Sequence, residues 1–146
     1  MGTPEFMREQ IAAKITQGYK TLKLKIGAID FETELSLLKA IRKEFSQSDI
    51  ELRVDANGAF SKENALEKLK RLSDFGLHSI EQPIRQGQWQ EMAYLCEVTP
   101  LAIALDEELI GLYENKEKEV LLTAVKPQYI IPVSYTHLTL PTTSRV

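Results

Sequence analysis

Hydrophobic and polar positions alternate along the chain with two different periods, and the period changes repeatedly. A period of two is typical of a half-buried strand, whereas a period near 3.6 is typical of a helix with one buried face. The segments of period two predict strands at residues 22–26, 50–57, 78–84, 101–107 and 128–131. The segments of longer period predict helices at about residues 4–16, 31–45, 62–75, 89–98 and 117–124.

Polar residues that favour helix starts stand before three of these helices. Thr3, followed by Pro4, is expected to cap the first helix, and Asp30 and Ser61 the second and third. A short polar side chain at this position can accept a hydrogen bond from the first helical turn. The second helix has a clear hydrophobic stripe, formed by Phe31, Leu35, Leu38, Ile41 and Phe45.

Strands that alternate with helices through short links are typical of a parallel sheet, either doubly wound or closed into a barrel. Equivalent positions recur regularly, because Lys25, Asp55, Glu81 and Asp106 are separated by 30, 26 and 25 residues. Each interval fits one strand–helix unit. A complete eight-stranded barrel requires about 250 residues. The 146 residues are therefore expected to supply about five parallel strands of a partial (β/α)8 TIM-type barrel.

Three carboxylates, those of Asp55, Glu81 and Asp106, are each predicted to end a different strand. The carboxyl ends of parallel strands form the edge where α/β proteins build their sites. Converging carboxylates repel one another unless a cation lies between them, and oxygen ligands suit Mg²⁺, with Mn²⁺ as the alternative. The sequence therefore predicts a divalent metal site. Glu107 and Glu108 are interpreted as charges at the start of a helix.

Lys23 and Lys25 lie two residues apart in the first predicted strand. Since side chains alternate between the faces of a strand, both ammonium groups are expected on one face, beside the acidic edge. A neighbouring ammonium and a metal ion both disfavour the charged form of a lysine, which must be neutral to act as a base. A metal ion can also stabilise the enediolate that forms when a carboxylate substrate loses its α-proton. The two lysines are therefore interpreted as part of a catalytic site.

Four motifs, in this order and at these intervals, resemble the enolase superfamily, specifically its muconate-lactonizing-enzyme-like branch. They are KLK at 23–25, VDAN at 54–57, IEQP at 80–83 and ALDE at 104–107. A lysine base combined with Mg²⁺ is a known pattern of that superfamily. Within the branch, the stretches LRVDANGAF, SIEQPI and IALDEELIG are most similar to the o-succinylbenzoate synthase family. The resemblance covers roughly residues 2–131.

The resemblance implies a lyase of menaquinone biosynthesis that acts on a cyclohexadiene carboxylate. Lys25 would remove the α-proton and then assist loss of the hydroxyl in a syn dehydration, and Lys23 would assist Lys25. Asn57 would line the substrate site. Three residues would hold Mg²⁺: Asp55, Glu81 and Asp106.

Two alternatives stay open. A dipeptide epimerase or N-acylamino acid racemase of the same superfamily uses lysines on both sides of its substrate. A receiver-type signalling domain also combines aspartates with a lysine on an α/β fold. In receivers the acidic pair ends the first strand and the lysine comes last, whereas here the lysines come first.

The resemblance implies a small carboxylate substrate as the partner, and composition argues against two other classes of partner. The net charge is −3 and the basic residues are dispersed, which argues against nucleic-acid binding. No apolar run approaches the ~20 residues that span a bilayer, so no membrane partner is expected. Cys96 is the single cysteine and is expected to be a packing thiol in a reducing, cytoplasmic environment. The oligomeric state is not indicated.

The C-terminal residues 133–146, VSYTHLTLPTTSRV, are expected to be a non-native tail, and residues 1–132 an internal fragment of the barrel domain. Pro132 cannot donate to a central parallel ladder, and the residues after it include neither lysine nor glycine. The stretch resembles a translated sequencing adapter. A second catalytic lysine and the capping domain of the family would then be missing. With two unpaired sheet edges, such a chain is expected to aggregate and to be inactive.

Overall fold

The computed structural model describes residues 4–132, and the predicted tail at 133–146 lies outside them. Strands and helices alternate in the predicted order. The strands are β1 (Thr21–Lys25), β2 (Glu51–Asp55), β3 (Ser79–Glu81), β4 (Ile103–Leu105) and β5 (Tyr129–Ile130). The helices are α1 (Pro4–Thr16), α2 (Phe31–Glu44), α3 (Ala65–Ser73), α4 (Trp89–Val98) and α5 (Asn115–Val125), with a 3₁₀ helix, η1 (Glu107–Leu109), after β4.

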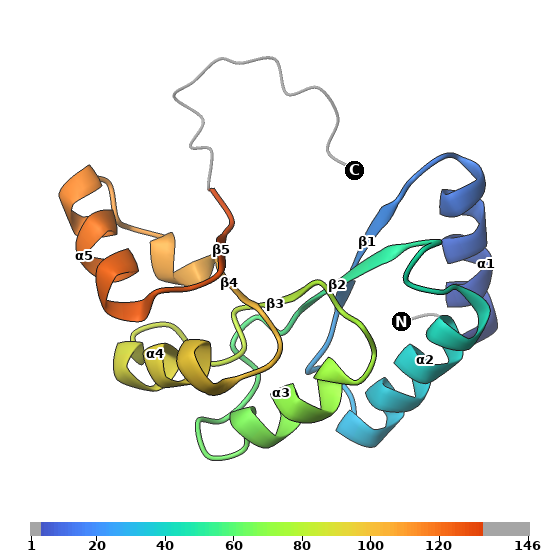
Figure 1. Cartoon of the computed structure of the whole chain (residues 1–146), viewed down its shortest axis with the longest axis horizontal. Helices are drawn as coiled ribbons and strands as arrows, with labels where there is room; N and C mark the ends of the chain where they lie inside the picture. Colours follow the sequence, from blue (N-terminus) through green and yellow to red (C-terminus); the bar gives the residue numbers. More distant parts are fainter. Residues whose placement is uncertain (1–3, 133–146) are drawn as a thin grey trace.

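The sheet is parallel throughout, and its strands lie in the order β1-β2-β3-β4-β5. Figure 1 shows the strands on the inner side of an open arc and the helices on its outer side. A sequential strand order is that of a barrel, whereas a doubly wound receiver-type sheet has the order 2-1-3-4-5. The chain is therefore a five-stranded part of a (β/α)8 barrel, as predicted, and not a receiver domain.

The hydrophobic core lies between the sheet and the surrounding helices. Every residue of β3 and β4 is buried, as expected for the central strands of a parallel sheet. From α2 the side chains of Leu35, Leu38 and Ile41 pack into the core, and α3 adds Leu69 and Leu72. The predicted stripe of the second helix is confirmed, since Phe31 packs against the main hydrophobic cluster and Phe45 against a second, smaller one.

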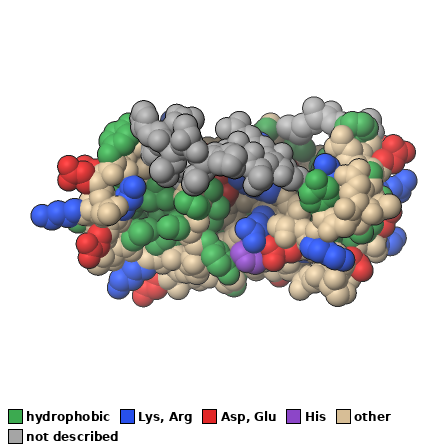
Figure 2. All heavy atoms as spheres, turned by 90° about the horizontal axis from the view of Figure 1, so that it is seen from above, with side chains coloured by type: hydrophobic (Ala, Val, Ile, Leu, Met, Phe, Trp, Pro, Cys, Tyr) green, Lys and Arg blue, Asp and Glu red, His purple; other side chains and the backbone are tan. Residues whose placement is uncertain are grey.

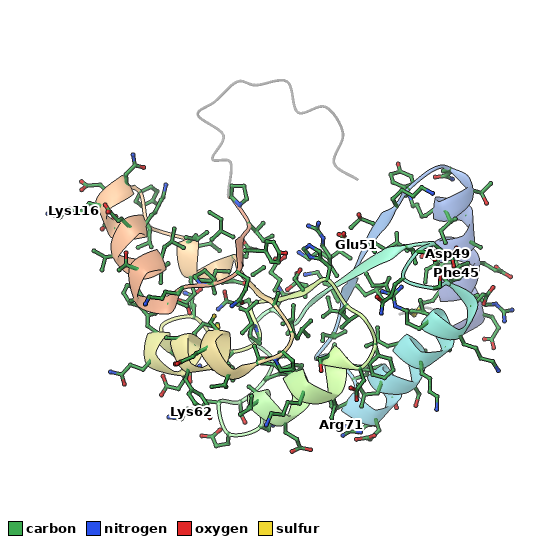
Figure 3. All side chains as sticks on the ribbon, in the orientation of Figure 1. Phe45, Asp49, Glu51, Lys62, Arg71 and Lys116 are labelled. Atoms are coloured by element: carbon green, nitrogen blue, oxygen red, sulfur yellow. The ribbon has the colours of Figure 1, made fainter. Side chains whose placement is uncertain are left out.

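Charged side chains occupy both sides of the arc. Figure 3 shows Lys62, Arg71 and Lys116 on the outer, helical side, whereas Glu51 lies on the inner side beside the strands. On the face seen in Figure 2, charges of both signs are interspersed and form no single basic stripe. The longest α-helix, α2, has 14 residues, and among residues 4–132 no helix is long and apolar enough to cross a membrane.

The predicted helix starts are confirmed at one position and wrong at another. The Asp30 carboxylate accepts the Thr33 backbone N–H at 3.1 Å and caps α2, as expected. Ser61, however, does not cap α3, which begins only at Ala65. Phe60 is buried and bridges to Ile84, so the chain makes a further turn through residues 62–64 before the helix can start.

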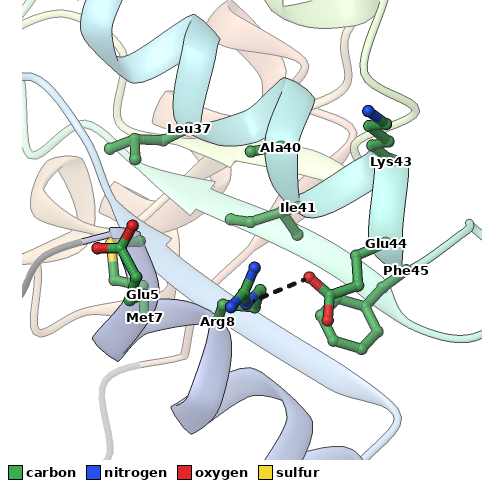
Figure 4. Close-up of a pocket in the computed structure, with 9 residues that line it drawn as sticks. All are labelled: Glu5, Met7, Arg8, Leu37, Ala40, Ile41, Lys43, Glu44 and Phe45. Atoms are coloured by element: carbon green, nitrogen blue, oxygen red, sulfur yellow. Dashed lines mark ion pairs between the residues drawn. The ribbon is translucent and has the colours of Figure 1, made fainter.

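An outer groove runs between α1 and α2 and has a cavity volume of about 530 Å³ (Figure 4). Its walls include Met7, Leu37 and Phe45. An ion pair between Arg8 and Glu44, with 3.6 Å between Nε and Oε2, lies at this groove. None of the residues predicted to form the functional site lines it.

Cys96 is buried in α4, and burial raises the pKa of its thiol to about 11. At pH 8 only about one thiol in a thousand would then be ionised, against about a quarter for an unperturbed cysteine. We predict that Ellman's reagent labels the native chain at least about 100-fold more slowly than the chain in denaturant. Because the sequence has one cysteine, the labelling curve reports this thiol alone. Equal rates in both states would contradict its role as a packing residue.

Candidate functional site

The lysine pair lies on the face of β1 that was predicted. Burial alternates along the strand: Lys23 and Lys25 are exposed, while Leu22 and Leu24 are partly buried on the opposite face. In the parallel register Lys25 pairs with Asp55, which in turn pairs with Glu81. The ends of β1, β2 and β3 therefore place an amine and two carboxylates side by side at one edge of the sheet.

Lys23 forms ion pairs with two carboxylates at this edge. Its Nζ lies 2.7 Å from Glu81 Oε2 and 3.0 Å from Asp55 Oδ2. The Asp55 and Glu81 side chains are only 3% and 5% exposed, whereas that of Lys23 is 44% exposed. Lys25 Nζ is farther away, at 3.8 Å from Asp55 Oδ2. Two buried negative charges thus share one ammonium group that reaches them from the open side of the sheet.

The pKa shifts follow from this crowding. Burial raises the pKa of the Glu81 carboxyl, and the neighbouring carboxylates of Asp55 and Asp106 raise it further, while Lys23 acts in the opposite direction. For Lys23, burial favours the neutral amine, but its bonds to Glu81 and Asp55 outweigh burial, and the net pKa is raised. Lys23 therefore stays charged, and the carboxylate pair still lacks positive charge.

Asn57 connects Lys25 to the loop after β4. Its Oδ1 accepts a hydrogen bond from Lys25 Nζ at 2.8 Å, and its Nδ2 donates to Glu107 Oε1 at 2.8 Å. An ammonium group only donates and a carboxylate only accepts, so the two contacts fix the orientation of the amide. The Asn57 backbone N–H also donates to Asp55 Oδ1 at 3.0 Å, and its φ is 45°. Asn57 thus holds the Lys25 amine through this hydrogen bond, and its role in lining a substrate site stays a prediction.

Asp106 approaches the pair but does not join it. Glu81 is level with Ala104, so Asp106 lies two residues farther along the same face of the sheet. It is close enough to raise the pKa of Glu81. Among the described residues, no three acidic, His or Cys side chains form a cluster that could hold a metal ion. The donors nevertheless fit Mg²⁺, because all three are carboxylates and the two buried ones, Asp55 and Glu81, share a single ammonium group. The ligand assignment stays a prediction.

The sequence alone did not predict that three polar side chains near the site are buried and hold the loops in place. They are Glu34, Gln82 and Glu108. Glu34 Oε1 accepts the Gly27 backbone N–H at 2.6 Å. Gly27 has a φ of +91°, and a Cβ there would lie 2.4 Å from the Ala59 Cβ, so only glycine fits at this end of β1. The burial of Glu34 could have been predicted from its position in the sequence, because it lies next to the hydrophobic stripe of the second helix.

The shared ammonium group makes a prediction about stability. Lys23→Met should lower the free energy of unfolding by about 1–3 kcal/mol, because it leaves two buried carboxylates without their nearest cation. We expect less than the ~3–5 kcal/mol of a fully buried pair, since the Lys23 side chain is 44% exposed. Lys25→Met is the matched control and should cost about 0.5 kcal/mol or less, because that side chain is 75% exposed. Denaturant unfolding of both variants measures the difference, and equal losses would contradict this role of Lys23.

The fold and the site together define part of an α/β barrel with an acidic strand edge and a lysine pair. Residues 6–118 match the family described as enolase C-terminal domain-like. The chain belongs to the enolase superfamily, as its motifs indicated.

Individual relatives are consistent with this membership. The chain is 63% identical over 131 residues to the o-succinylbenzoate synthase of Desulfotalea psychrophila. The aligned residues cover 90% of this chain and 35% of that protein. The crystal structure of MenC from the same organism aligns with a TM-score of 0.83 at 61% identity, over 89% of this chain and 35% of that one. The chain thus spans about a third of the length of these relatives.

More distant relatives share the fold with other activities. A hydrophobic dipeptide epimerase of Enterococcus faecalis is 31% identical over 114 residues, which are 78% of this chain and 32% of that protein. The structure of L-talarate dehydratase from Polaromonas, complexed with Mg and L-glucarate, aligns with a TM-score of 0.79 at 24% identity, over 90% of this chain and 36% of that one.

Proposed function

We propose that the chain is part of an o-succinylbenzoate synthase, a carbon–oxygen lyase of menaquinone biosynthesis. The proposal depends chiefly on one observation: Lys23 and Lys25 lie on the same edge of the sheet as the buried carboxylates of Asp55 and Glu81. The choice of this synthase within the superfamily is supported by the 63% identity to the D. psychrophila protein, against 31% to the epimerase.

The proposed metal ligands are Asp55, Glu81 and Asp106. Mg²⁺, with Mn²⁺ as the alternative, would supply positive charge that stabilises the substrate carboxylate as its α-proton leaves. Magnesium in the related talarate dehydratase structure supports this assignment. Asp55 and Glu81 are suited to the role because they are already fixed by the register of β2 and β3. In the described structure Lys23 contacts these same two carboxylates.

Lys25 is the proposed base. Its neutral amine can donate one hydrogen to Asn57 Oδ1, which lies 2.8 Å away, and direct its lone pair at the α-carbon of the substrate. The α-proton moves to Lys25 Nζ, and the electron pair of the broken C–H bond is delocalised into the substrate carboxylate. The resulting ammonium then gives the proton to the leaving hydroxyl on the same face. The ring gains a C=C bond, and water leaves.

Lys23 has a supporting role in this proposal. Its charged amine lies beside the carboxylates and next to Lys25 on the strand. A second positive charge there favours binding of a small anionic substrate and disfavours protonation of Lys25. The proposed substrate is accordingly a cyclohexadiene carboxylate, whose negative charge the Lys23 ammonium group and the bound metal ion would offset.

The base can be tested in a chimera in which this chain replaces the matching segment of the D. psychrophila synthase. Lys25→Ala should lower the rate of dehydration roughly 10²–10⁴-fold, which is the contribution of a positioned base. Product absorbance measures turnover, and α-proton exchange in deuterated water measures proton abstraction separately. Lys39→Ala, an exposed lysine of α2, is the matched control and should leave both rates unchanged.

Two outcomes of this experiment would contradict the proposal. Unchanged turnover in the Lys25→Ala chimera would remove Lys25 from the role of base. If the unmutated chimera epimerised dipeptides but did not dehydrate the cyclohexadiene carboxylate, the epimerase would replace the synthase as the function.

A further inference from the structure

Glu108 is a buried carboxylate that the proposed chemistry does not use. It lies in η1, two residues after Asp106, and is 6% exposed. The sequence suggested only a charge at the start of a helix, and Glu108 does stand in the first turn of η1. A buried carboxylate is costly unless it accepts several hydrogen bonds, so its partners indicate what it is for.

The described donors to Glu108 come from residues 82–89, which run from the end of β3 to the first residue of α4. The Gly87 backbone N–H lies 3.0 Å from Oε1 and 3.1 Å from Oε2. The indole Nε1 of Trp89 donates to Oε2 at 3.1 Å, and Gln82 Nε2 lies 3.4 Å from Oε1. Within residues 4–132, no ion pair involves Glu108. The described contacts of the Glu108 carboxylate are therefore hydrogen bonds from neutral donors. These hydrogen bonds in turn hold residues 82–89 in place.

Gln82 connects Glu108 to two of the proposed metal ligands, Glu81 and Asp106. It directly follows Glu81, is fully buried and has a φ of 41°, a backbone conformation that is uncommon for residues other than glycine. Its Nε2 also donates to Ile84 O at 3.0 Å, and its Oε1 lies 3.5 Å from the backbone N of Asp106. The side chain of Gln82 thus lies between Glu108 and the backbone of Asp106.

We propose that Glu108 is a positioning residue for the metal site, an inference that rests on the function proposed above. The Glu108 carboxylate fixes Gln82 in its unusual conformation. Gln82 in turn sets the direction in which the chain leaves β3 after Glu81, and it restrains the start of the loop at Asp106. The register of the sheet fixes Asp55 and Glu81, but Asp106 lies beyond the last pair of β3 with β4. Its position therefore depends on this network.

The test uses Glu108→Gln, which keeps the size of the side chain and removes its charge. The matched control is Glu119→Gln, the same change at an exposed position of α5. Both variants are made in the full chain and, so that the result does not depend on the solubility of that chain, in the chimera. Mg²⁺ affinity is measured by calorimetry, and exchange of the Gly87 amide hydrogen is followed without metal. Trp89, the single tryptophan, reports its own contact with Glu108 by fluorescence in the full chain.

We expect Glu108→Gln to raise the Mg²⁺ dissociation constant about tenfold, since outer-shell partners of metal ligands typically contribute 10–100-fold. Gly87 exchange should become faster and the Trp89 emission should shift, while Glu119→Gln changes none of the three quantities. If Glu108→Gln fails to fold, Gln82→Met is used instead, because it removes the hydrogen bonds of the amide and keeps the side-chain volume. The same tenfold increase in the Mg²⁺ dissociation constant is expected.

Two results would overturn the inference, and they can be told apart. Faster Gly87 exchange with an unchanged Mg²⁺ dissociation constant would make Glu108 a residue that only stabilises the loop. If the unmutated protein bound no Mg²⁺, the proposed metal site itself would be refuted, and the role of Glu108 would fall with it.

Discussion

Two buried carboxylates that lie side by side, Asp55 and Glu81, are the constraint on which the rest of the site depends. Their mutual repulsion must be offset by positive charge, and in the described structure that charge is the Lys23 ammonium group, 2.7 Å and 3.0 Å away. One ammonium group does not satisfy both carboxylates, because the pKa of Glu81 remains raised. A divalent cation would meet the same need more fully. The proposed metal-dependent function is based on this need for further positive charge.

The fold supplies this crowding through the register of parallel strands. Each strand ends at the same edge, so one polar residue from each of β1, β2 and β3 reaches the same place. The loops that follow must then hold their conformations against this charge. Gly27 allows β1 to end close to Ala59, Asn57 fixes Lys25, and Glu108 binds the segment after β3. Structural and chemical roles thus belong to neighbouring residues in the same loops.

Much of this architecture could be predicted from the sequence, because it depends on local periods. The alternation in KLK placed Lys23 and Lys25 on one face, and the regular intervals between strand ends indicated successive strand–helix units of a parallel sheet. The start of α3 was missed because the contact of Phe60 with Ile84 spans 24 residues, and no local cap signal reveals it. The offset of Asp106 from Glu81 was also missed, since a spacing along the chain does not give the register between strands. The burial of Glu108 depends on Gly87 and Trp89, about 20 residues away, whereas its sequence neighbours suggested only a charge at the start of a helix.

The central claim is that the carboxylates of Asp55, Glu81 and Asp106 hold one divalent cation beside the lysine pair. Anomalous diffraction from crystals of the chimera grown with Mn²⁺ tests it most directly, because it locates the metal without relying on activity. We expect a single Mn²⁺ bonded to one oxygen or more from each of the three carboxylates, with Lys23 no longer bridging Asp55 and Glu81. An anomalous peak elsewhere, or Lys23 still between the two carboxylates in crystals saturated with Mn²⁺, would contradict it.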